Sequence, residues 1–454
     1  MAARSVYGIA EVCGGKVFNC ENDINITQIV INDKECVTNC CYVAIKGEKH
    51  NGSDFINNAV KNGAVAVLAD EMQSIELPFI LVDNVIEALG KIARYYRDKE
   101  LETVVAVTGS VGKTTVKEMC ATVLSEKTEV RKTMGNKNNL IGLPLSILSD
   151  SKGEIGVFEA GISEIGEMDR LSRILTPDIA VITNVGGMHG QTLGNKEDIA
   201  REKLKILTYA KEKCILIVPA DEPLLLGKAK NTVTVGVEKP LADYNAVNIR
   251  FNENGSVFDI ETKSGEVIKD IFVAMLGRHA CLDAAFAFAV AVRCGLNENE
   301  IRNGLKRYKS DGIRQNIIEK NGVTVMVDCY NLGPPSAVAS LEAFSIMNSF
   351  RKPKRSIVML GSMLELGESA ESEHIKVGKL VAKSGVDCLI TVGSLAQNIA
   401  LGALMGGMKK ENVYFFNEAQ RKEAKAVLDN LCERNCTLLI KGSRKMKMEE
   451  FLGD

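Results

Sequence analysis

Short apolar runs alternate with amphipathic stretches along most of the chain, most strongly from about residue 99. There an apolar strand is predicted at 104–107 and a helix at 115–125, with a glycine-containing loop between them. Further apolar strands are predicted at 156–159, 179–183 and 214–218. Short apolar strands separated by helices are typical of a mostly parallel sheet covered on both faces.

The segment before residue 99 is also of mixed type. It contains a predicted helix at 86–98. Its short strand-like runs lie at 27–31, 41–45, 64–68 and 79–82. We therefore expect a small N-terminal α/β domain at 1–98.

The central segment carries an antiparallel addition. Residues 247–261 contain the turn sequence Asn252-Glu253-Asn254-Gly255, which predicts a hairpin added to the parallel sheet. A predicted helix at 284–294 ends at Gly295, a common stop signal. The central parallel-sheet domain is expected at 99–311.

A third α/β unit begins near residue 312. Its helices are predicted to include 336–347 and 373–384. Its strands are predicted at 324–328, 355–360, 388–391 and 437–440. Because 454 residues exceed what one hydrophobic core serves, we expect an α/β protein of three domains, ending in a Rossmann-like domain at 312–454.

Composition and charge limit the kinds of partner and the compartment that we expect for this protein. The net charge of -2 gives no electrostatic reason to expect nucleic acid or an anionic membrane surface. No apolar run approaches the roughly 20 residues that span a bilayer, and polar residues interrupt the N-terminus before a signal-peptide core could form. The 13 cysteines are scattered without zinc-site spacing. We expect a cytoplasmic protein with reduced, structural thiols.

The loop after residues 104–107 carries the strongest chemical signal. Glycines at 109 and 112 let backbone N–H groups point at phosphate oxygens, Lys113 adds a cation, and Thr114 can bind Mg²⁺. Val107 stands where the general phosphate-loop pattern has its first glycine. A buried strand before the loop and a helix after it favour nucleotide binding over an ordinary tight turn. The predicted nucleotide contacts are Thr108, Gly109, Ser110, Val111, Gly112, Lys113, Thr114 and Thr115.

The run VVAVTGSVGKTTVKEM resembles the ATP loop of the Mur ligase family, which itself lacks that first glycine. Other stretches resemble the D-alanyl-D-alanine-adding branch of the family in order and spacing, over essentially the whole chain. They are YVAIKGEKHNGSDFINNAVKNGAVAVL, TMGNKNNLIGLPLSIL, FEAGISEIGEM, TNVGGMHGQTLGNKEDIAREK, LGRHACLDAAFAFAVA, DCYNLGPPS, LGSMLELGE and KGSRKM.

The resemblance implies an ADP-forming ligase of peptidoglycan precursor synthesis. ATP would phosphorylate the carboxylate of a UDP-N-acetylmuramoyl-tripeptide, and D-alanyl-D-alanine would attack the resulting acyl phosphate to form an amide. Catalysis would then consist mainly of positioning and charge neutralisation. The implied cofactors are ATP and Mg²⁺ at two sites, the implied partners are these small molecules, and a monomer is expected. The N-terminal domain would hold the uridine nucleotide.

The family also implies roles for individual side chains. Lys113 would bind the β- and γ-phosphates, while Thr114 and Glu159 would bind the first Mg²⁺. His189 matches the ligand of a second Mg²⁺. Lys203 matches a lysine that CO₂ carbamylates into a carboxylate-like metal ligand.

Further positions match the nucleotide-contacting residues of the family. Arg314 corresponds to the arginine that enters from the last domain toward the γ-phosphate, although Ile313 separates it from the glycine it usually follows. The late motif at 441–444 is interpreted as a substrate contact or, equally, as a basic surface turn. The remaining nucleotide contacts are expected at Asn138, His279, Asp328, Tyr330 and Asn331.

The chain departs from the family pattern mainly at positions that contact ligands in the family. The chain has Ala280 and Asp283 where the family has amides that face adenine, which predicts weaker or less selective ATP binding. Three hypotheses remain open: the tripeptide ligase itself, a paralogue with another carboxylate or amine, and a nucleotide-binding partner without catalysis. The other departures are Asn32-Asp33-Lys34, Asn39-Cys40-Cys41, Leu140, Lys205, Gly333, Pro335 and Ser362.

Overall fold

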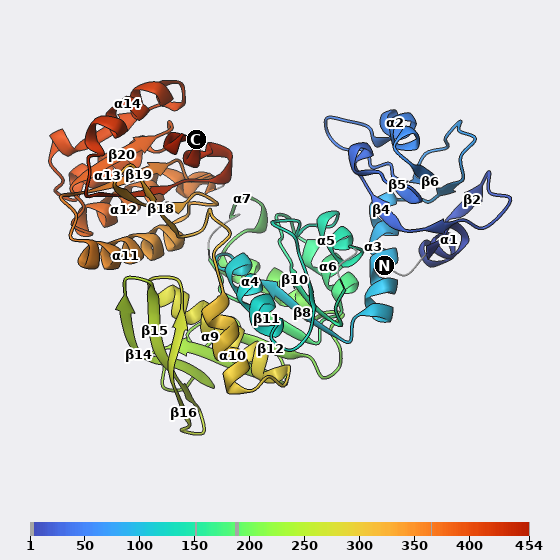
Figure 1. The fold of residues 1–454 in the computed structure, drawn as a ribbon, viewed down its shortest axis with the longest axis horizontal. Coiled ribbons are helices and arrows are strands. Elements are labelled where there is room, and N and C mark those ends of the chain that lie inside the picture. The colour runs from blue at the N-terminus through green and yellow to red at the C-terminus, as the bar shows by residue number, and fades with distance from the viewer. Residues whose placement is uncertain (1–3, 150–151, 187–189, 365, 454) are drawn as a thin grey trace.

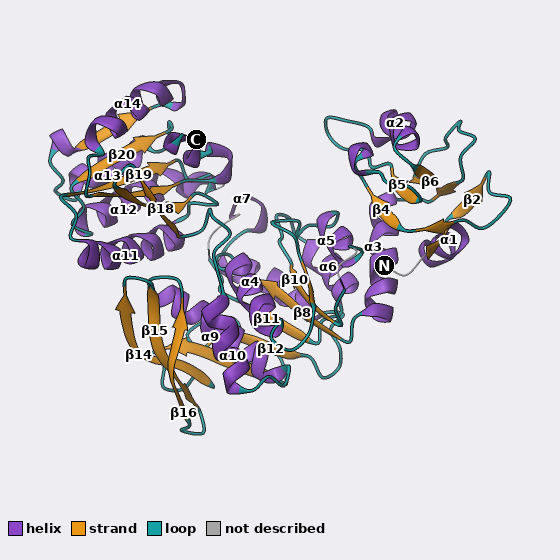
Figure 2. Cartoon of the chain, viewed as in Figure 1, coloured by secondary structure: helices purple, strands orange, loops and turns teal. Residues whose placement is uncertain are grey.

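The computed structural model describes residues 4–149, 152–186, 190–364 and 366–453. Within them, three main sheets follow one another along the chain, each covered by helices (Figures 1 and 2). The central body lies between the N-terminal body and the C-terminal body (Figure 1). The three-domain α/β architecture predicted from the sequence is confirmed, while the limits at 98/99 and 311/312 stay predictions.

The central sheet has the strand order β16-β15-β14-β13-β12-β11-β8-β10-β9. From β9 to β14 neighbouring strands are parallel, and β15 and β16 continue the sheet antiparallel. The strands are β8 Thr103–Thr108, β9 Val130–Lys132, β10 Ile155–Glu159, β11 Ile179–Ile182, β12 Ile215–Pro219, β13 Thr232–Val237, β14 Tyr244–Asn252, β15 Gly255–Thr262 and β16 Val267–Val273.

This strand order brings the ends of three apolar strands together. After β8 the chain moves to β9 and β10 on one side, then crosses to β11 on the other side of β8. Ligands of parallel sheets bind beyond the carboxyl ends of the strands where the order reverses in this way. The central helices are α4 Lys113–Leu124, α5 Gly142–Ile147, α6 Glu167–Leu175, α7 Gly190–Leu193, α8 Lys196–Leu204, α9 Arg278–Arg293 and α10 Glu298–Arg307.

The N-terminal sheet has the order β2-β7-β6-β5-β4, with β2 antiparallel at one edge. Strands β1 and β3 form a separate antiparallel pair. The elements are β1 Arg4–Ser5, α1 Val6–Cys13, β2 Lys16–Phe18, β3 Asn25–Ile26, β4 Gln28–Val30, β5 Cys40–Val43, α2 Ile56–Lys61, β6 Ala64–Ala69 and β7 Phe79–Leu81.

Helix α3, Val85–Glu100, joins the first two bodies. It packs on α1 of the N-terminal body and on α5 and α6 of the central body. Its buried Arg97 donates hydrogen bonds to the carbonyl oxygens of Leu175 (2.7 Å) and Thr176 (2.7 Å) and pairs with Asp178 at 2.8 Å. Since a buried guanidinium needs several partners, these contacts fix α3 to the central body.

The C-terminal sheet has the order β17-β18-β22-β19-β20-β21 and is parallel except for β17 at its edge. Its strands are β17 Asn316–Lys320, β18 Val323–Asp328, β19 Arg355–Gly361, β20 Cys388–Val392, β21 Val413–Phe416 and β22 Cys436–Lys441. Its helices are α11 Pro334–Arg351, α12 Ala370–Lys383, α13 Gln397–Met405 and α14 Arg421–Leu431.

The sequence pattern predicted most of these elements but missed some. The hairpin expected at 247–261 is β14 and β15, extended by β16, which was not predicted. The helix expected to begin at 115 begins at Lys113, because Gly112 caps it with a positive φ of 85°. Among the described residues, no helix is both long and apolar enough to cross a membrane.

Candidate active site

The loop between β8 and α4 has the backbone geometry that its glycines predict. Gly112 adopts φ 85°, a region that residues with a side chain rarely occupy. A Cβ on Gly109 would collide with Thr183 Oγ1 at the end of β11. Thr108 and Thr115 are buried beside the loop, and α4 begins directly after it at Lys113.

Asn184, directly after β11, holds this loop in place. Its Oδ1 accepts hydrogen bonds from the amides of Ser110 (3.0 Å) and Val111 (2.9 Å), and its Nδ2 donates to the Val111 carbonyl at 2.8 Å. The Ser110 hydroxyl also bonds to the backbone of Gly186. The sequence analysis did not single out Asn184, although an amide directly after a buried strand was a visible signal.

Lys113 turns back over the loop. Its Nζ donates to the carbonyl oxygens of Gly109 (2.9 Å) and Ser110 (3.3 Å). Burial lowers the pKa of Lys113, the Glu159 carboxylate raises it, and the Arg314 guanidinium lowers it further. An ammonium that bears this desolvation penalty gains strongly from a phosphate anion.

Glu159 ends β10 and lies in the floor of the site with 1% of its surface exposed. Its Oε2 accepts a hydrogen bond from Thr114 Oγ1 at 2.7 Å, and its Oε1 accepts one from Asn138 Nδ2 at 2.7 Å. A carboxylate beside a hydroxyl at a phosphate loop is the oxygen donor set that Mg²⁺ prefers, so these residues fit the predicted metal. No group of three or more His, Cys, Asp or Glu side chains suited to a metal occurs in the described part of the chain.

Lys203 lies in α8 of the central body. Only 4% of its surface is exposed, and no hydrogen bond or ion pair of its ammonium is found among the described residues. Burial and then the charge of Lys113 lower the pKa of Lys203 well below its usual range. The predicted metal ligand His189 lies outside the described residues.

Arg314 connects the segment that opens the C-terminal domain with the loop. Its Nη2 donates to Thr114 Oγ1 at 2.9 Å, and its Nε donates to Asp311 at 3.3 Å. The guanidinium stacks on the Tyr330 ring, 3.5 Å from the centroid. The insertion of Ile313 therefore does not keep this arginine from the site.

The ends of β18 and β22 meet opposite the loop. Lys441 pairs with Asp328 at 2.6 Å and is 2% exposed, so the interpretation of position 441 as a surface turn is wrong. Burial would raise the pKa of Asp328, but Lys441 and Ser340 hold it below its usual range. Burial lowers the pKa of nearby His279 to about 4. His279 Nε2 lies 3.2 Å from Gln315 Nε2, and its Nδ1 has no hydrogen-bond partner among the residues that the structure describes.

Two adjoining cavities flank the loop. One, of about 390 Å³, is lined by Lys113, Thr114, Asn138, Glu159, Arg314 and Tyr330, together with neighbouring residues. The other, of about 220 Å³, is lined by Gly112, Thr115, His279, Asp283, Asp328 and Lys441, among others. Val111, Gly112, Arg314, Tyr330, Asn331 and Ser336 line both. The structure thus gathers the described predicted residues, except Thr108, Gly109 and Lys203, along one continuous hollow.

Several departures from the family pattern have local structural reasons. Asn39 adopts φ 65°, which asparagine tolerates better than other side chains. Lys205 pairs with Glu202 at 2.6 Å. Ser362 is buried, and its Oγ accepts a hydrogen bond from the Ala396 amide at 3.2 Å. Ala280 is fully buried in the central core, whereas Asp283 lines the cavity.

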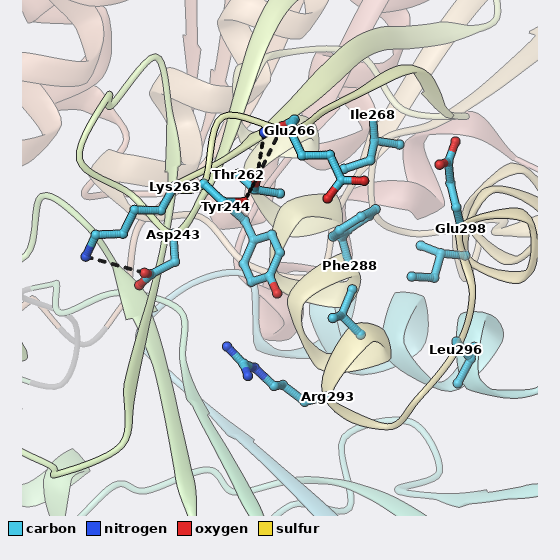
Figure 3. Close-up of a pocket in the computed structure, with 13 residues that line it drawn as sticks. Asp243, Tyr244, Thr262, Lys263, Glu266, Ile268, Phe288, Arg293, Leu296 and Glu298 are labelled. Atoms are coloured by element: carbon cyan, nitrogen blue, oxygen red, sulfur yellow. Dashed lines mark hydrogen bonds and ion pairs between the residues drawn. The ribbon is translucent and has the colours of Figure 1, made fainter.

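A further cavity, of about 440 Å³, lies away from the loop between β14–β16 and the helices α9 and α10 (Figure 3). Tyr244, Phe288 and Arg293 line it, and Lys263 pairs with Asp243 at its edge at 3.7 Å (Figure 3). None of the predicted site residues that the structure describes lines this cavity. This cavity is therefore not the candidate active site, despite its volume.

The fold and the site together are those of a nucleotide-dependent ligase. Residues 25–97 match the Mur ligase family catalytic domain, residues 107–291 the Mur ligase middle domain, and residues 313–444 the Mur ligase glutamate ligase domain. The UDP-N-acetylmuramoyl-tripeptide–D-alanyl-D-alanine ligase of Bacillus subtilis is 35% identical, over 100% of this chain and 98% of that protein. This chain belongs to the Mur ligase family.

Solved structures agree with this assignment. MurF from Acinetobacter baumannii superposes with a TM-score of 0.89 at 25% identity, covering 100% of this chain and 99% of that one. MurF ligase from Thermotoga maritima, solved in complex with ADP, gives a TM-score of 0.82 at 29% identity over 94% and 96% of the two chains.

Proposed function

We propose that this protein joins D-alanyl-D-alanine to UDP-N-acetylmuramoyl-tripeptide and converts ATP to ADP and phosphate. The observation that carries the chemistry is the contact of Arg314 with Thr114, which itself donates to Glu159. It places a cation from the C-terminal segment beside a phosphate loop and a buried carboxylate. The substrates follow from the full-length similarity to the B. subtilis ligase.

The reaction would proceed in two displacements. A carboxylate oxygen of the tripeptide attacks the γ-phosphorus of ATP, the bond to the bridging oxygen breaks, and ADP leaves. The amine of D-alanyl-D-alanine then attacks the acyl carbon, loses a proton and expels phosphate. Both steps concentrate negative charge, which Lys113, the loop amides and Arg314 would stabilise.

Bound Mg²⁺ would neutralise charge between the phosphate oxygens, with Thr114 and Glu159 as protein ligands. Two such sites are proposed, and His189 is assigned to the second from the family pattern alone. Asn138 would orient Glu159 through the hydrogen bond to Oε1.

We also propose that Lys203 is carbamylated. A buried lysine with a lowered pKa is in part a neutral amine, and only the neutral amine reacts with CO₂. The carbamate would place an anion at this buried position, close to the Lys113 charge. The N-terminal body would hold the uridine nucleotide, and a cytoplasmic monomer stays a prediction.

An ADP-release assay tests the proposal. ADP should form rapidly only when UDP-N-acetylmuramoyl-tripeptide and D-alanyl-D-alanine are both present. Release with the dipeptide and a different carboxylate would identify a paralogue. Nucleotide binding without release under any pairing would instead indicate a partner without catalysis.

A further inference from the structure

The cavity of about 440 Å³ between β14–β16 and the helices α9 and α10 takes no part in the proposed reaction (Figure 3). Much of its lining is apolar and belongs to the buried core of the central body. Phe288, Ile268, Leu296 and Ile301 are the buried apolar residues of the lining. Cavities of this size commonly bind small molecules, and such a lining favours a ligand with an apolar body.

Tyr244 of β14 brings a polar group to this apolar lining. The residue is 9% exposed, and its ring centroid lies 5.7 Å from that of Phe288, with 57° between the ring planes. Its hydroxyl makes no hydrogen bond with any residue that the structure describes. Since a buried tyrosine hydroxyl usually has a hydrogen-bond partner, this one is free to contact a ligand in the cavity.

Arg293, the last residue of α9, lines the same cavity and is exposed to solvent. The Tyr244 hydroxyl points toward its side chain (Figure 3). Burial raises the pKa of Tyr244, and the nearby Arg293 guanidinium lowers it, as a cation beside a phenol does. Within the described part of the chain, Arg293 has no hydrogen bond from its guanidinium and no ion pair. Two hydrogen-bond donors without partners therefore lie close together at the cavity.

Most of the other charged groups that line the cavity are already paired. Lys263 pairs with Asp243 at 3.7 Å, and Glu298 pairs with Arg302 at 2.6 Å. Among the described lining residues, Arg293 is thus the only cation without an ion-pair partner. An unpaired guanidinium beside a hydroxyl donor is complementary to a carboxylate, which can accept hydrogen bonds from both.

We propose that this cavity binds a small carboxylic acid with an aromatic or branched apolar body. The carboxylate of the ligand accepts hydrogen bonds from Arg293 and Tyr244, and its apolar body packs on Phe288. A single negative charge fits better than a polyphosphate, because the exposed carboxylate of Glu266 also lines the cavity and repels added negative charge. This site is separate from the proposed ATP site and adds a ligand that the proposed reaction does not include.

Ligand-observed NMR titration of the full-length protein with phenylacetate tests the proposal. Phenylacetamide, which has nearly the same shape and no charge, is the matched ligand. Excess ADP and Mg²⁺ are added to both titrations, so that the cations of the phosphate loop are not free to bind the acid. The wild type should bind phenylacetate about tenfold more tightly than phenylacetamide, because charge-assisted hydrogen bonds are the stronger ones.

Two substitutions remove the two donors separately. Arg293→Gln should lower the affinity for phenylacetate about tenfold and leave the affinity for phenylacetamide unchanged. Tyr244→Phe should lower the affinity for phenylacetate about threefold, since one hydrogen bond is lost and the ring is kept. Arg250→Gln is the control and should bind as the wild type does. This exposed arginine on β14 pairs with Asp259 and Asp270 and does not line the cavity.

The inference is overturned if Arg293→Gln binds phenylacetate as tightly as the wild type does. Equal affinity of the wild type for the acid and the amide also overturns it, as does the absence of saturable binding of phenylacetate. None of these outcomes bears on the proposed ligase function, because ADP release with the two proposed substrates is measured separately and does not involve this cavity.

Discussion

Lys113 combines burial with positive charge, and the loop carbonyls of Gly109 and Ser110 are its hydrogen-bond partners here. Both carbonyls are weaker partners than a phosphate oxygen. Lys113→Ala should therefore keep the fold and lose about 3–5 kcal/mol of transition-state stabilisation, or about a thousandfold in rate. Steady-state ADP release measures this, with exposed Lys263→Ala as the control. Near-normal release by folded Lys113→Ala would exclude this loop as the ATP site.

Lys203 offers a test that depends on its modification. Lys203→Ala should be nearly inactive and partly rescued by added acetate or formate, because a small carboxylate can take the place of the proposed carbamate. Lys203→Glu should be poor, since its shorter side chain does not reach as far. The measurement is the rate of ADP release by Lys203→Ala with and without the added anions. Lys205→Ala, measured in the same way, is the control. Full activity of Lys203→Ala without added anion would leave this lysine a structural role only.

Asp283 should also make the stability of the protein depend on pH. Its pKa is raised by folding from 3.8 to about 8, so the folded state holds a proton that the unfolded state releases over this range. The stabilisation is complete below about pH 4 and is lost progressively as pH rises to about 8, on the order of 5 kcal/mol in all. The melting temperature of Asp283→Asn relative to wild type should therefore increase from pH 5 to pH 8.5. A constant difference would mean that Asp283 titrates normally.

At the scale of elements, the segment after β11 determines the shape of the phosphate loop. Asn184 makes its three hydrogen bonds to Ser110 and Val111 with a single side chain. Asn184→Ala should raise the KM for ATP by about tenfold or more without unfolding the protein, because the loop loses its preorganised shape. Asn254→Ala, at the exposed β14–β15 turn, is the control. An unchanged KM would show that the loop keeps its shape without the hydrogen bonds of the Asn184 side chain.

The sequence predicted the apolar strands and the phosphate loop because both depend on local patterns. It did not predict β16, a strand whose burial alternates only partly. Nor did it predict the hydrogen bonds of Asn184 to the phosphate loop or the Asp328–Lys441 ion pair, since both join segments distant in the sequence. The raised pKa of Asp283 was not predicted either, because it depends on burial that no single-sequence pattern records.

At the scale of the whole molecule, the site depends on two bodies at once. The loop, Glu159 and Lys203 belong to the central body, while Tyr330, Asp328 and Lys441 belong to the C-terminal body. Arg314 bridges them through Thr114 and Tyr330. Any change in the position of the C-terminal body would therefore change the surroundings of the bound phosphates.

The central claim is that this architecture transfers phosphate to a carboxylate before an amide forms. The most direct measurement uses UDP-N-acetylmuramoyl-tripeptide whose reacting carboxylate carries ¹⁸O, with mass spectrometry of the phosphate and the peptide product. The account predicts one labelled oxygen in the phosphate per turnover, together with a peptide that has gained D-alanyl-D-alanine less one water. Unlabelled phosphate released alongside the same product would contradict the account, since the amide would then have formed without an acyl phosphate.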